Sequence, residues 1–502
     1  MSQLASPYSD RLFEELRELL GEDALSREPA IVNSYAEDDS FASPTTPAFV
    51  VWPRSSEKLQ EIVRRAGKYG IPLIPISSGL GFRQHGDTVP TQAQSVIVDL
   101  SRMNRILRID VPNRVVMVEP GVTFSQLIPE VEKNGLRLMQ PLLPRSGKSV
   151  LTSALEREPT IIPRFHWDTS DPLLCTEIVF GTGDLFRTGS AAGPGTIDEQ
   201  LAAGSAQKNP MGPTQFNLFQ TIQGAQGSLG IVTWVSLKCE LKPKLQKLFF
   251  AQAEDLGCLI PMANEALRMR LGDELFLMSR QAFSSFAKES SQEIGALGQT
   301  LKEWVFLICL GGRGQFANEK VGYQEADLAD MAKRLNISLE PGLAGLEDCS
   351  ILDLLHTTKE TPWQYNAHGG CQSIFFITTL DRVPSFVRKV KSTLKEAFGG
   401  KPECGVYIQP QVQGCNCHLE FQLYYDPGDK EESDNTRRAF NQLSQELMDE
   451  GAFFSRPYGC WAPTMYSKVS PQVVQTLRKV KKIFDPGNIM KPGSLCFGEV
   501  DP

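Results

Sequence analysis

Residues 74–100 read IPISSGLGFRQHGDTVPTQAQSVIVDL, a glycine- and serine-rich turn between two apolar runs. The first run ends at Ile76, the segment SSGLG follows, and the polar tip FRQHG precedes the strand-like run VIVDL. Glycine and serine directly after a buried strand leave backbone N–H groups that a ligand can approach closely. The pattern predicts a loop suited to a pyrophosphate, with a plain chain turn as the alternative.

Strand and helix patterns alternate around this loop. Residues 49–52 predict a strand, residues 53–56 offer an N-cap, and residues 57–68 form an apolar stripe that predicts a helix ending at Gly70. This strand–helix–strand order is a βαβ unit with the glycine-rich turn after its second strand. Further strands are expected at 96–100 and 115–119, then a helix at 123–134.

Two more segments have the composition of phosphate-binding turns. PLLPRSGKSVLTSALE, which begins at Pro141, places Ser146, Gly147 and Ser149 before a helical pattern, so it predicts either a second phosphate cradle or a plain helix N-cap. QGAQGSLGIVT, residues 223–233, passes from glycines into a strand. A hairpin is expected between them, at 176–187.

Composition narrows the class of protein. A chain of 502 residues predicts two large domains, and the net charge of −8 argues against nucleic acid or an anionic membrane as the main partner. Eleven scattered cysteines predict reduced thiols rather than a disulfide framework. No secretory signal and no membrane span is recognisable, so we expect a cytoplasmic enzyme.

In their order along the chain, the segments resemble the flavoprotein family of vanillyl-alcohol oxidase and p-cresol methylhydroxylase. The resemblance covers nearly the whole chain and is carried by VVWPRSSEKLQEIVRRA, ISSGLGFRQHGDTVP, VIVDLSRMNRILRID, VEPGVTFSQL, FGTGDLFRTG, QGSLGIVT and IFDPGNIMKPG. It implies an α+β flavoprotein with an FAD-binding domain (1–243), a cap domain with an antiparallel sheet and helices (244–464), and a C-terminal segment (465–502) that returns to the FAD domain. Within the cap, strands are expected at 304–310, 373–378 and 418–425, helices at 383–398 and 436–448, and a charged loop at 426–436.

The resemblance also implies where FAD and substrate bind. Asp168 matches the family's acid near flavin N5, and Arg456 matches the arginine that holds the anionic oxygen of the substrate; a locally bonded loop aspartate and a surface arginine are the alternatives. His418 has the matching spacing from Arg456, and Tyr458 is a candidate catalytic neighbour. The expected FAD-binding residues are Ser77, Ser78, Gly79, Leu80, Gly81, Phe82, Gln84, His85, Ser146, Gly147, Ser149, Gly227, Gly230, Ile231 and Val232.

Several positions depart from the family. Ser455 and Gln84 or His85 stand where phenol-binding members carry tyrosines, which argues against a para-substituted phenol as substrate. Ser373 stands near the position where the family attaches FAD covalently, and neither a histidine nor a tyrosine is found there. We therefore expect non-covalent FAD, with His85 as the alternative attachment point. Cys415 and Cys417 lack a second ligand pair at zinc-like spacing, so no metal is expected.

The leading hypothesis is an FAD-dependent dehydrogenase or oxidase acting on an alcohol or benzylic carbon of a small anionic or phenolic substrate. A D-2-hydroxy-acid dehydrogenase with a protein electron acceptor is the second, although GCNCHLEF keeps only Asn416 and His418 of that branch's metal segment. A flavin-binding electron-transfer subunit without its own substrate is the third. A homo-oligomer, namely a dimer, is expected, and a separate electron-acceptor protein is one candidate reoxidant.

Overall fold

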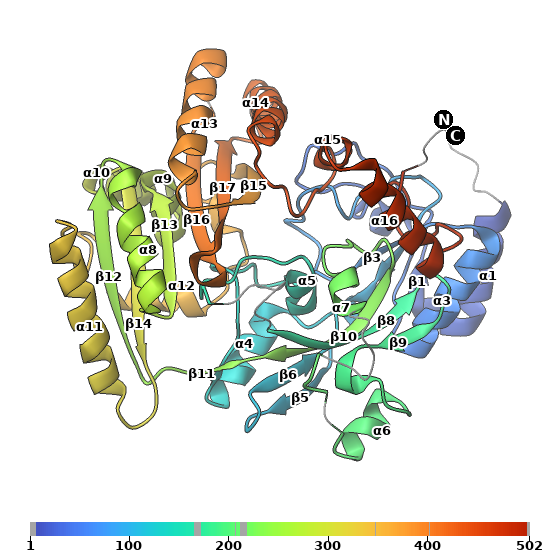
Figure 1. Ribbon diagram of the computed structural model, residues 1–502. Helices are drawn as coiled ribbons and strands as arrows, with labels where there is room; N and C mark the ends of the chain where they lie inside the picture. Colours follow the sequence, from blue (N-terminus) through green and yellow to red (C-terminus); the bar gives the residue numbers. More distant parts are fainter. Residues whose placement is uncertain are drawn as a thin grey trace.

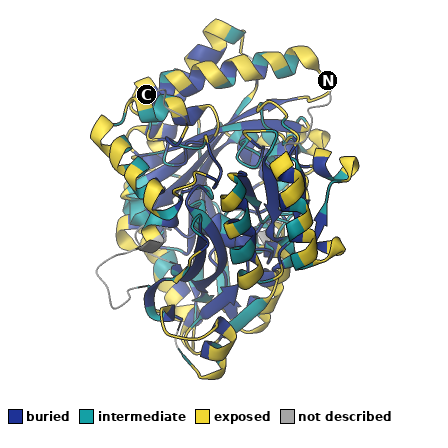
Figure 2. Cartoon of the chain, turned by 90° about the vertical axis from the view of Figure 1, so that its right-hand side faces the viewer, coloured by how far each residue is buried: buried dark blue, intermediate teal, exposed yellow. Residues whose placement is uncertain are grey.

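The computed structural model describes residues 7–164, 172–205, 207–210, 218–346, 348–400 and 402–498, and it forms two lobes (Figure 1). The first lobe contains two main sheets and the second contains one large sheet. Buried strands lie inside and exposed helical faces lie outside (Figure 2). Within the described residues, no helix is both long and apolar enough to cross a bilayer.

The βαβ unit expected around residues 49–76 is present. Strand β2 (Phe49–Val51) leads into α3 (Ser56–Tyr69) and then β3 (Leu73–Ile76). The Ser55 side chain caps α3, and Gly70 ends it in the left-handed conformation at φ 63°. Strand β4 (Val96–Asp99) pairs in parallel with both β2 and β3, and β1 (Leu25–Ser26) adds an antiparallel edge.

A second, antiparallel sheet of the same lobe has the order β5-β6-β10-β8-β9. The elements of this half not yet given are α1 (Pro7–Leu20), α2 (Pro29–Asn33), β5 (Ile106–Asp110), β6 (Val115–Val118), α4 (Phe124–Lys133), β7 (Leu136–Arg137), α5 (Val150–Leu155), β8 (Leu173–Phe180), β9 (Leu185–Arg187), α6 (Ile197–Ala202), α7 (Leu218–Ile222), β10 (Gly230–Lys238) and β11 (Glu240–Leu241).

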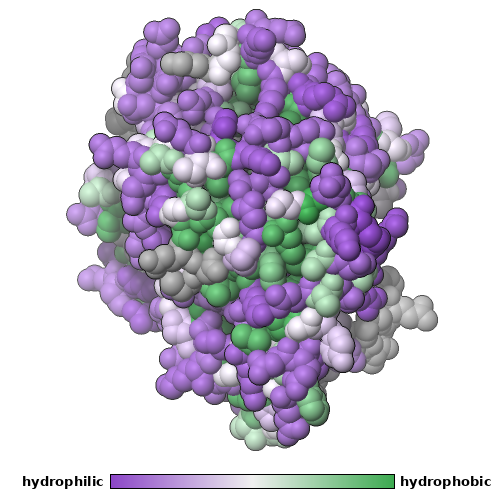
Figure 3. Space-filling view, turned by 90° about the vertical axis from the view of Figure 1, so that its left-hand side faces the viewer, coloured by the Kyte–Doolittle hydropathy of each residue, from purple (hydrophilic) through white to green (hydrophobic). Residues whose placement is uncertain are grey.

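The second lobe is built on a six-stranded antiparallel sheet of order β12-β14-β13-β16-β17-β15. Its elements are β12 (Leu245–Ala253), α8 (Ile260–Met269), β13 (Glu274–Ser279), α9 (Arg280–Ala287), α10 (Ser291–Thr300), β14 (Trp304–Gly312), α11 (Ala317–Arg334), α12 (Asp348–His356), β15 (Gly370–Thr378), α13 (Val383–Phe398), β16 (Cys404–Gln411), β17 (Asn416–Tyr425) and α14 (Lys430–Asp449). On the face of this lobe that carries α11, apolar side chains gather in the middle and hydrophilic side chains surround them (Figure 3).

The two faces of the six-stranded sheet bury different cores. One core includes Phe306 and Phe421 and is covered by helices of the same lobe. The other includes Phe276 and Tyr407 and also contains Leu142 and Ile161 of the first lobe. The second core therefore joins the two lobes.

The end of the chain returns to the first lobe through α15 (Trp461–Ser467) and α16 (Pro471–Phe484). Asp485 accepts the backbone N–H groups of Ile489 (3.0 Å) and Met490 (2.7 Å), which shapes the turn of the DPGNIMKPG signature. Leu73 N donates to the Ile489 carbonyl (2.8 Å), and Lys491 N donates back to the Leu73 carbonyl (3.0 Å). The tail thereby lies directly beside β3.

The prediction of a charged loop at 426–436 is wrong from residue 430 onward, because α14 begins at Lys430. The Asp429 carboxylate accepts the N–H groups of Glu431 and Glu432 (2.8 and 3.1 Å), which is the pattern of a helix N-cap. Acidic residues in the first turn are favoured there by the helix dipole. The run of charges is the first turn of a helix.

Candidate active site

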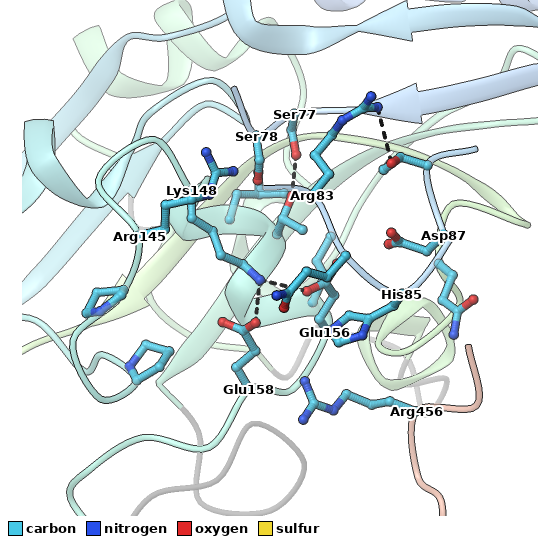
Figure 4. Close-up of a pocket in the computed structure, with 18 of the residues that line it drawn as sticks. Ser77, Ser78, Arg83, His85, Asp87, Arg145, Lys148, Glu156, Glu158 and Arg456 are labelled. Atoms are coloured by element: carbon cyan, nitrogen blue, oxygen red, sulfur yellow. Dashed lines mark hydrogen bonds and ion pairs between the residues drawn. The ribbon is translucent and has the colours of Figure 1, made fainter. Parts of the chain in front are cut away.

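A cavity lies between the two lobes, with walls from both (Figure 4). The first lobe lines it with the loop after β3, the segment 141–159 and the stretch 222–232. The second lobe contributes Trp363, Ser373, Phe375, Tyr407, His418, Glu420 and Arg456. Lys491 of the returning tail completes the wall.

The loop after β3 contains unused backbone donors, several of them on residues that line this cavity. Within the described residues, the N–H groups of Ser78 and of residues 80–85 find no acceptor. Phe82 (φ 51°), His85 (φ 74°), Gly81 (φ 85°) and Gly86 (φ 68°) have left-handed backbone, so the loop winds tightly. Successive free N–H groups in such a loop form a nest for an anion. This geometry fits the pyrophosphate expected from the sequence.

The N-terminal segment and the second lobe both brace the loop. Arg83 donates to the carbonyls of Ser34 and Glu37 (2.8 Å each), and Gly86 N donates to Asp38 Oδ2 (2.7 Å). Gln84 Nε2 donates to the Tyr365 hydroxyl of the second lobe (2.7 Å). The loop is therefore held from two sides.

The members of the loop fall into two groups. Ser77, Ser78, Phe82, Gln84 and His85 line the cavity, as expected for cofactor-binding residues. Gly79, Leu80 and Gly81 are not among the lining residues, and the last two are exposed.

The two loop glycines differ in what they do. Gly79 N is occupied by the Gly147 carbonyl (3.0 Å), and a Cβ at Gly79 would meet that oxygen at an ordinary 3.6 Å. Only Gly81 needs glycine for its backbone conformation.

The second expected phosphate cradle is instead a structural connection. Ser149 accepts Thr152 N (3.1 Å) as the N-cap of α5 and donates to the Pro120 carbonyl (2.6 Å). Ser146 Oγ donates to Thr358 Oγ1 of the second lobe (3.0 Å). Ser146, Gly147 and Ser149 do not line the cavity; their neighbours Arg145 and Lys148 do.

The third glycine-rich segment does reach the cavity, since Gly227, Gly230, Ile231 and Val232 all line it. A Cβ at Gly227 would lie 2.5 Å from Pro75, and one at Gly230 would lie 2.6 Å from the Val179 carbonyl. Gly227 is required by close packing against the Pro75 ring, and Gly230 by close packing against the backbone of β8.

His418 and Glu420 form a hydrogen-bonded pair on β17. His418 Nε2 lies 3.2 Å from Glu420 Oε2, while Ser373 Oγ (2.8 Å) and Gln422 Nε2 (3.0 Å) donate to Glu420 Oε1. Burial opposes ionisation of Glu420, but these hydrogen bonds and His418 outweigh it and lower its pKa to about 2. Burial lowers the pKa of His418 despite the carboxylate. His418 was expected from the sequence, and Glu420 was not.

Arg456 lies in the loop between α14 and α15 and is only 7% exposed. Its guanidinium carbon lies 4.2 Å from the centre of the Phe375 ring, and it forms no hydrogen bond or ion pair with the part of the chain that the structure describes. Tyr458 lies one layer behind the wall, where it stacks on His85 at 4.8 Å, and is not a lining residue. The geometry thus places Arg456, but not Tyr458, at the cavity.

A cluster that sequence reasoning missed lies between the FAD loop and Arg456. Lys148 Nζ contacts Glu156 Oε2 (3.2 Å) and Glu158 Oε1, and all three side chains line the cavity (Figure 4). The available signal was a pair of glutamates after the helical pattern that follows Ser149, but charged residues after a helix usually face solvent.

Three other expectations concern FAD attachment, metal binding and the acid near flavin N5. Ser373 lines the cavity, and its hydroxyl donates to Glu420. Cys415 is exposed and Cys417 buried, and the described residues contain no group of three or more His, Cys, Asp or Glu side chains able to hold a metal. Asp168 lies outside the described residues.

Comparison with known proteins identifies the class. A model of the FAD binding domain matches residues 47–189, and a model of the C-terminal domain of FAD linked oxidases matches residues 376–495. The protein is an FAD-dependent oxidoreductase. It belongs to the FAD-linked oxidase superfamily, with the fold of the p-cresol methylhydroxylase flavoprotein.

Its relatives span more than one substrate class. The chain is 22% identical to the 4-cresol dehydrogenase [hydroxylating] flavoprotein subunit of Pseudomonas putida (89% of this chain, 87% of that protein) and 23% identical to D-2-hydroxyglutarate dehydrogenase of Stutzerimonas stutzeri (96% and 98%). The crystal structure of p-cresol methylhydroxylase with substrate bound superposes with TM-score 0.80 at 21% identity, covering 99% of this chain and 98% of that chain. The 4-ethylphenol oxidase from Gulosibacter chungangensis also gives 0.80, at 18% identity and the same coverage.

Proposed function

We propose that the protein oxidises an alcohol or benzylic carbon of a small substrate whose anionic oxygen is bound by Arg456. The observation that carries this proposal is the buried guanidinium at the cavity wall, which forms no direct ion pair or hydrogen bond with the described residues and interacts with Glu156 and Glu158 only through space. A buried charge is costly unless it is paired. A bound carboxylate or phenolate would supply the missing partner, and the planar guanidinium can hold either with two hydrogen bonds.

The remaining wall near Arg456 is aromatic, which favours a flat or apolar substrate body. Phe375 packs edge-on against His85 (5.2 Å between ring centres), and Tyr407 lies 6.0 Å from the His418 ring. Trp363 and Tyr407 are in edge contact at 6.5 Å. Such rings exclude water and fix a substrate by shape, with few polar groups setting its orientation.

FAD supplies the two-electron oxidant, and the chain's residues supply binding, orientation and a dry site. Glu420 stays ionised and accepts a hydrogen bond from the His418 Nε2–H group, which leaves His418 Nδ1 as an acceptor. In this arrangement His418 offers a hydrogen-bond acceptor at the cavity wall while Arg456 holds the anionic end. The cavity-lining residues of the loop 77–85 and of the segment 227–232 would hold FAD in the first lobe.

Oxidation of a D-2-hydroxy acid is the second candidate, and the carboxylate of such a substrate equally suits Arg456. The relatives include D-2-hydroxyglutarate dehydrogenase and the glycolate oxidase subunit GlcD of Bacillus subtilis. Of the two residues that matched this branch, His418 lines the cavity and Asn416 does not. This placement favours the first candidate.

An anaerobic screen of FAD reduction tests the proposal. Alcohols, phenols and 2-hydroxy acids are mixed with the FAD-loaded protein and loss of the flavin absorbance is recorded, with product analysis for each active compound. We expect reduction by substrates with an anionic group and none by their uncharged analogues. Reduction by the uncharged analogues at equal affinity would contradict the role of Arg456, and the absence of any reduction would favour the electron-transfer subunit. Oxygen and a separate acceptor protein are then compared as reoxidants.

A further inference from the structure

The proposed function leaves one buried cluster of the cavity unused. Lys148 lies between Glu156 and Glu158, and the three side chains are only 16–23% exposed. They lie on the side of the cavity where Arg456 and His85 also point inward (Figure 4). Two carboxylates and one ammonium leave this cluster with one excess negative charge, which favours protonation of one carboxyl group.

The two carboxylates differ in how well they are stabilised. Glu158 contacts Lys148 through one oxygen and accepts the Ser153 hydroxyl (2.7 Å) through the other. Burial opposes its ionisation, but the charges of Lys148 and Arg456 outweigh that and lower its pKa. Glu158 is therefore the carboxylate that stays ionised.

The ionised form of Glu156 is less well stabilised than that of Glu158. Its Oε2 lies 3.2 Å from Lys148, and within the described residues its Oε1 has no hydrogen-bond donor. Burial raises its pKa to about 7, with Asp87 and Glu158 adding to the increase against the charges of Lys148 and Arg456. Lys491 and Tyr458 are the other titratable groups that interact with it.

The histidines of the cavity are poorly suited to keep a proton. Burial, followed by the charges of Arg456 and Lys148, lowers the pKa of His85 to about 3, and burial lowers that of His418 as well. Oxidation of an alcohol nevertheless releases one proton from the substrate hydroxyl. That proton needs an acceptor that is ionised at neutral pH and able to be protonated there.

We propose that Glu156 is the proton-exchanging residue of this cavity and takes up the proton that the substrate hydroxyl releases. The inference rests on the proposed oxidation. In that step the substrate C–H bond breaks, its hydrogen and electron pair pass to FAD, the carbonyl forms, and the hydroxyl proton passes to the Glu156 carboxylate. Lys148 is a positioning residue that orients Glu156 and sets how readily it ionises.

The first test measures protonation directly and needs no substrate. Infrared difference spectra of the FAD-loaded protein are recorded between about pH 5 and pH 9. Carboxyl groups with an ordinary pKa are mostly ionised throughout this range, so a protonated-carboxyl band reports a group whose pKa is raised. We expect a protonated-carboxyl band that disappears as the pH rises and is missing in Glu156→Gln. Lys148→Met should move its midpoint upward, and Glu158→Gln should move it downward, because the first removes a positive and the second a negative neighbour.

The second test follows FAD reduction by stopped flow over the same pH range. The limiting rate should rise with pH through the midpoint seen in the infrared, whereas Glu156→Gln should be slower by about 10²-fold and lack this pH dependence, with substrate affinity nearly unchanged. A wild-type pH limb that persists in Glu156→Gln would overturn the inference. If no substrate reduces FAD, the proposed function fails, and the absence of the infrared band then separately overturns the assignment of Glu156. If Glu156→Gln does not retain FAD, the infrared midpoint of Lys148→Met replaces it as the test. A midpoint at higher pH than in wild type supports the inference, and a midpoint that is unchanged or lower overturns it.

Discussion

At the scale of single residues, the guanidinium of Arg456 sets the charge of the substrate end of the cavity. Arg456→Ala should leave FAD bound, because Arg456 forms no hydrogen bond with the loop of residues 77–85 among the described residues. We expect weaker binding of substrate and transition state by about 2–5 kcal/mol, as for loss of a buried charge partner. Arg456→Lys should recover little, since a point charge cannot reproduce a planar two-pronged donor.

The measurement is stopped-flow reduction of FAD, with affinity and limiting rate fitted separately. A neutral substrate analogue serves as the control, and its affinity should be the same in wild type and Arg456→Ala. An anionic substrate that binds Arg456→Ala as tightly as wild type would refute the anchoring role.

Ser373 makes a further residue-scale prediction. Its hydroxyl, at the position near which the resembled flavoproteins attach FAD, is donated to Glu420 (2.8 Å) and is a poor linking group. The purified protein should therefore be yellow and should release FAD into solution on acid precipitation. Flavin that stays with the pellet would instead indicate a covalent bond, and peptide mapping should then begin at His85, which lines the same cavity.

At the scale of elements, the loop after β3 depends on one glycine more than on the other. Gly81 has φ 85°, whereas Gly79 has no positive φ and has room for a Cβ. Gly81→Ala should cost about 1–2 kcal/mol of loop stability and weaken FAD binding accordingly. The matched control is Gly79→Ala, whose FAD affinity, measured by fluorescence titration of the apoprotein, should stay within about twofold of wild type. Equal losses in both variants would mean that backbone strain is not the cause.

Sequence reasoning succeeded where a local pattern determines structure and failed where distant segments meet. The cap at Ser55, the stop at Gly70 and the helix 383–398 were predicted because each is set by neighbouring residues. The start of α14 was missed, because charges near Asp429 read equally well as a loop.

The candidate site divides in the same way. His85, His418 and Arg456 were found through motif spacing, and the structure places all three at the cavity. Glu420 and the Lys148–Glu156–Glu158 cluster were missed, because their surroundings come from both lobes and from elements far apart in the sequence. Ser149 matched a phosphate-binding pattern but is a helix cap, since both uses favour the same residue types.

At the scale of the whole molecule, an ion pair joins the lobes behind the cavity. Arg137 of β7 and Glu274 of β13 are 2% and 0% exposed and in direct contact. Arg137→Met should therefore cost about 3–5 kcal/mol, because it leaves a buried carboxylate without its partner. The double variant Arg137→Met/Glu274→Leu should recover most of the loss. Urea unfolding of the three FAD-loaded proteins measures this, and a double variant as unstable as the single would show that packing, rather than charge, is the cause.

The same interface should make stability depend on pH through His356, the last residue of α12. Its ring lies 3.8 Å from Glu132, and burial, followed by the charges of Arg137 and Lys242, lowers its pKa to about 3. A histidine whose pKa is lower in the folded than in the unfolded state contributes stability above the unfolded value of about 6.5, and that contribution is lost as the pH falls toward 3. Each pH unit in this window costs about 1.4 kcal/mol, because only the unfolded chain binds the proton. Glu156 acts in the opposite direction, since its raised pKa means that the folded chain binds more protons there.

The comparison is therefore made between wild type and His356→Gln, in which all other groups are retained. From pH 6.5 to pH 5, the stability of wild type relative to His356→Gln in urea unfolding should fall by about 2 kcal/mol. A difference that stays constant over this range would mean that His356 titrates alike in the folded and unfolded chains.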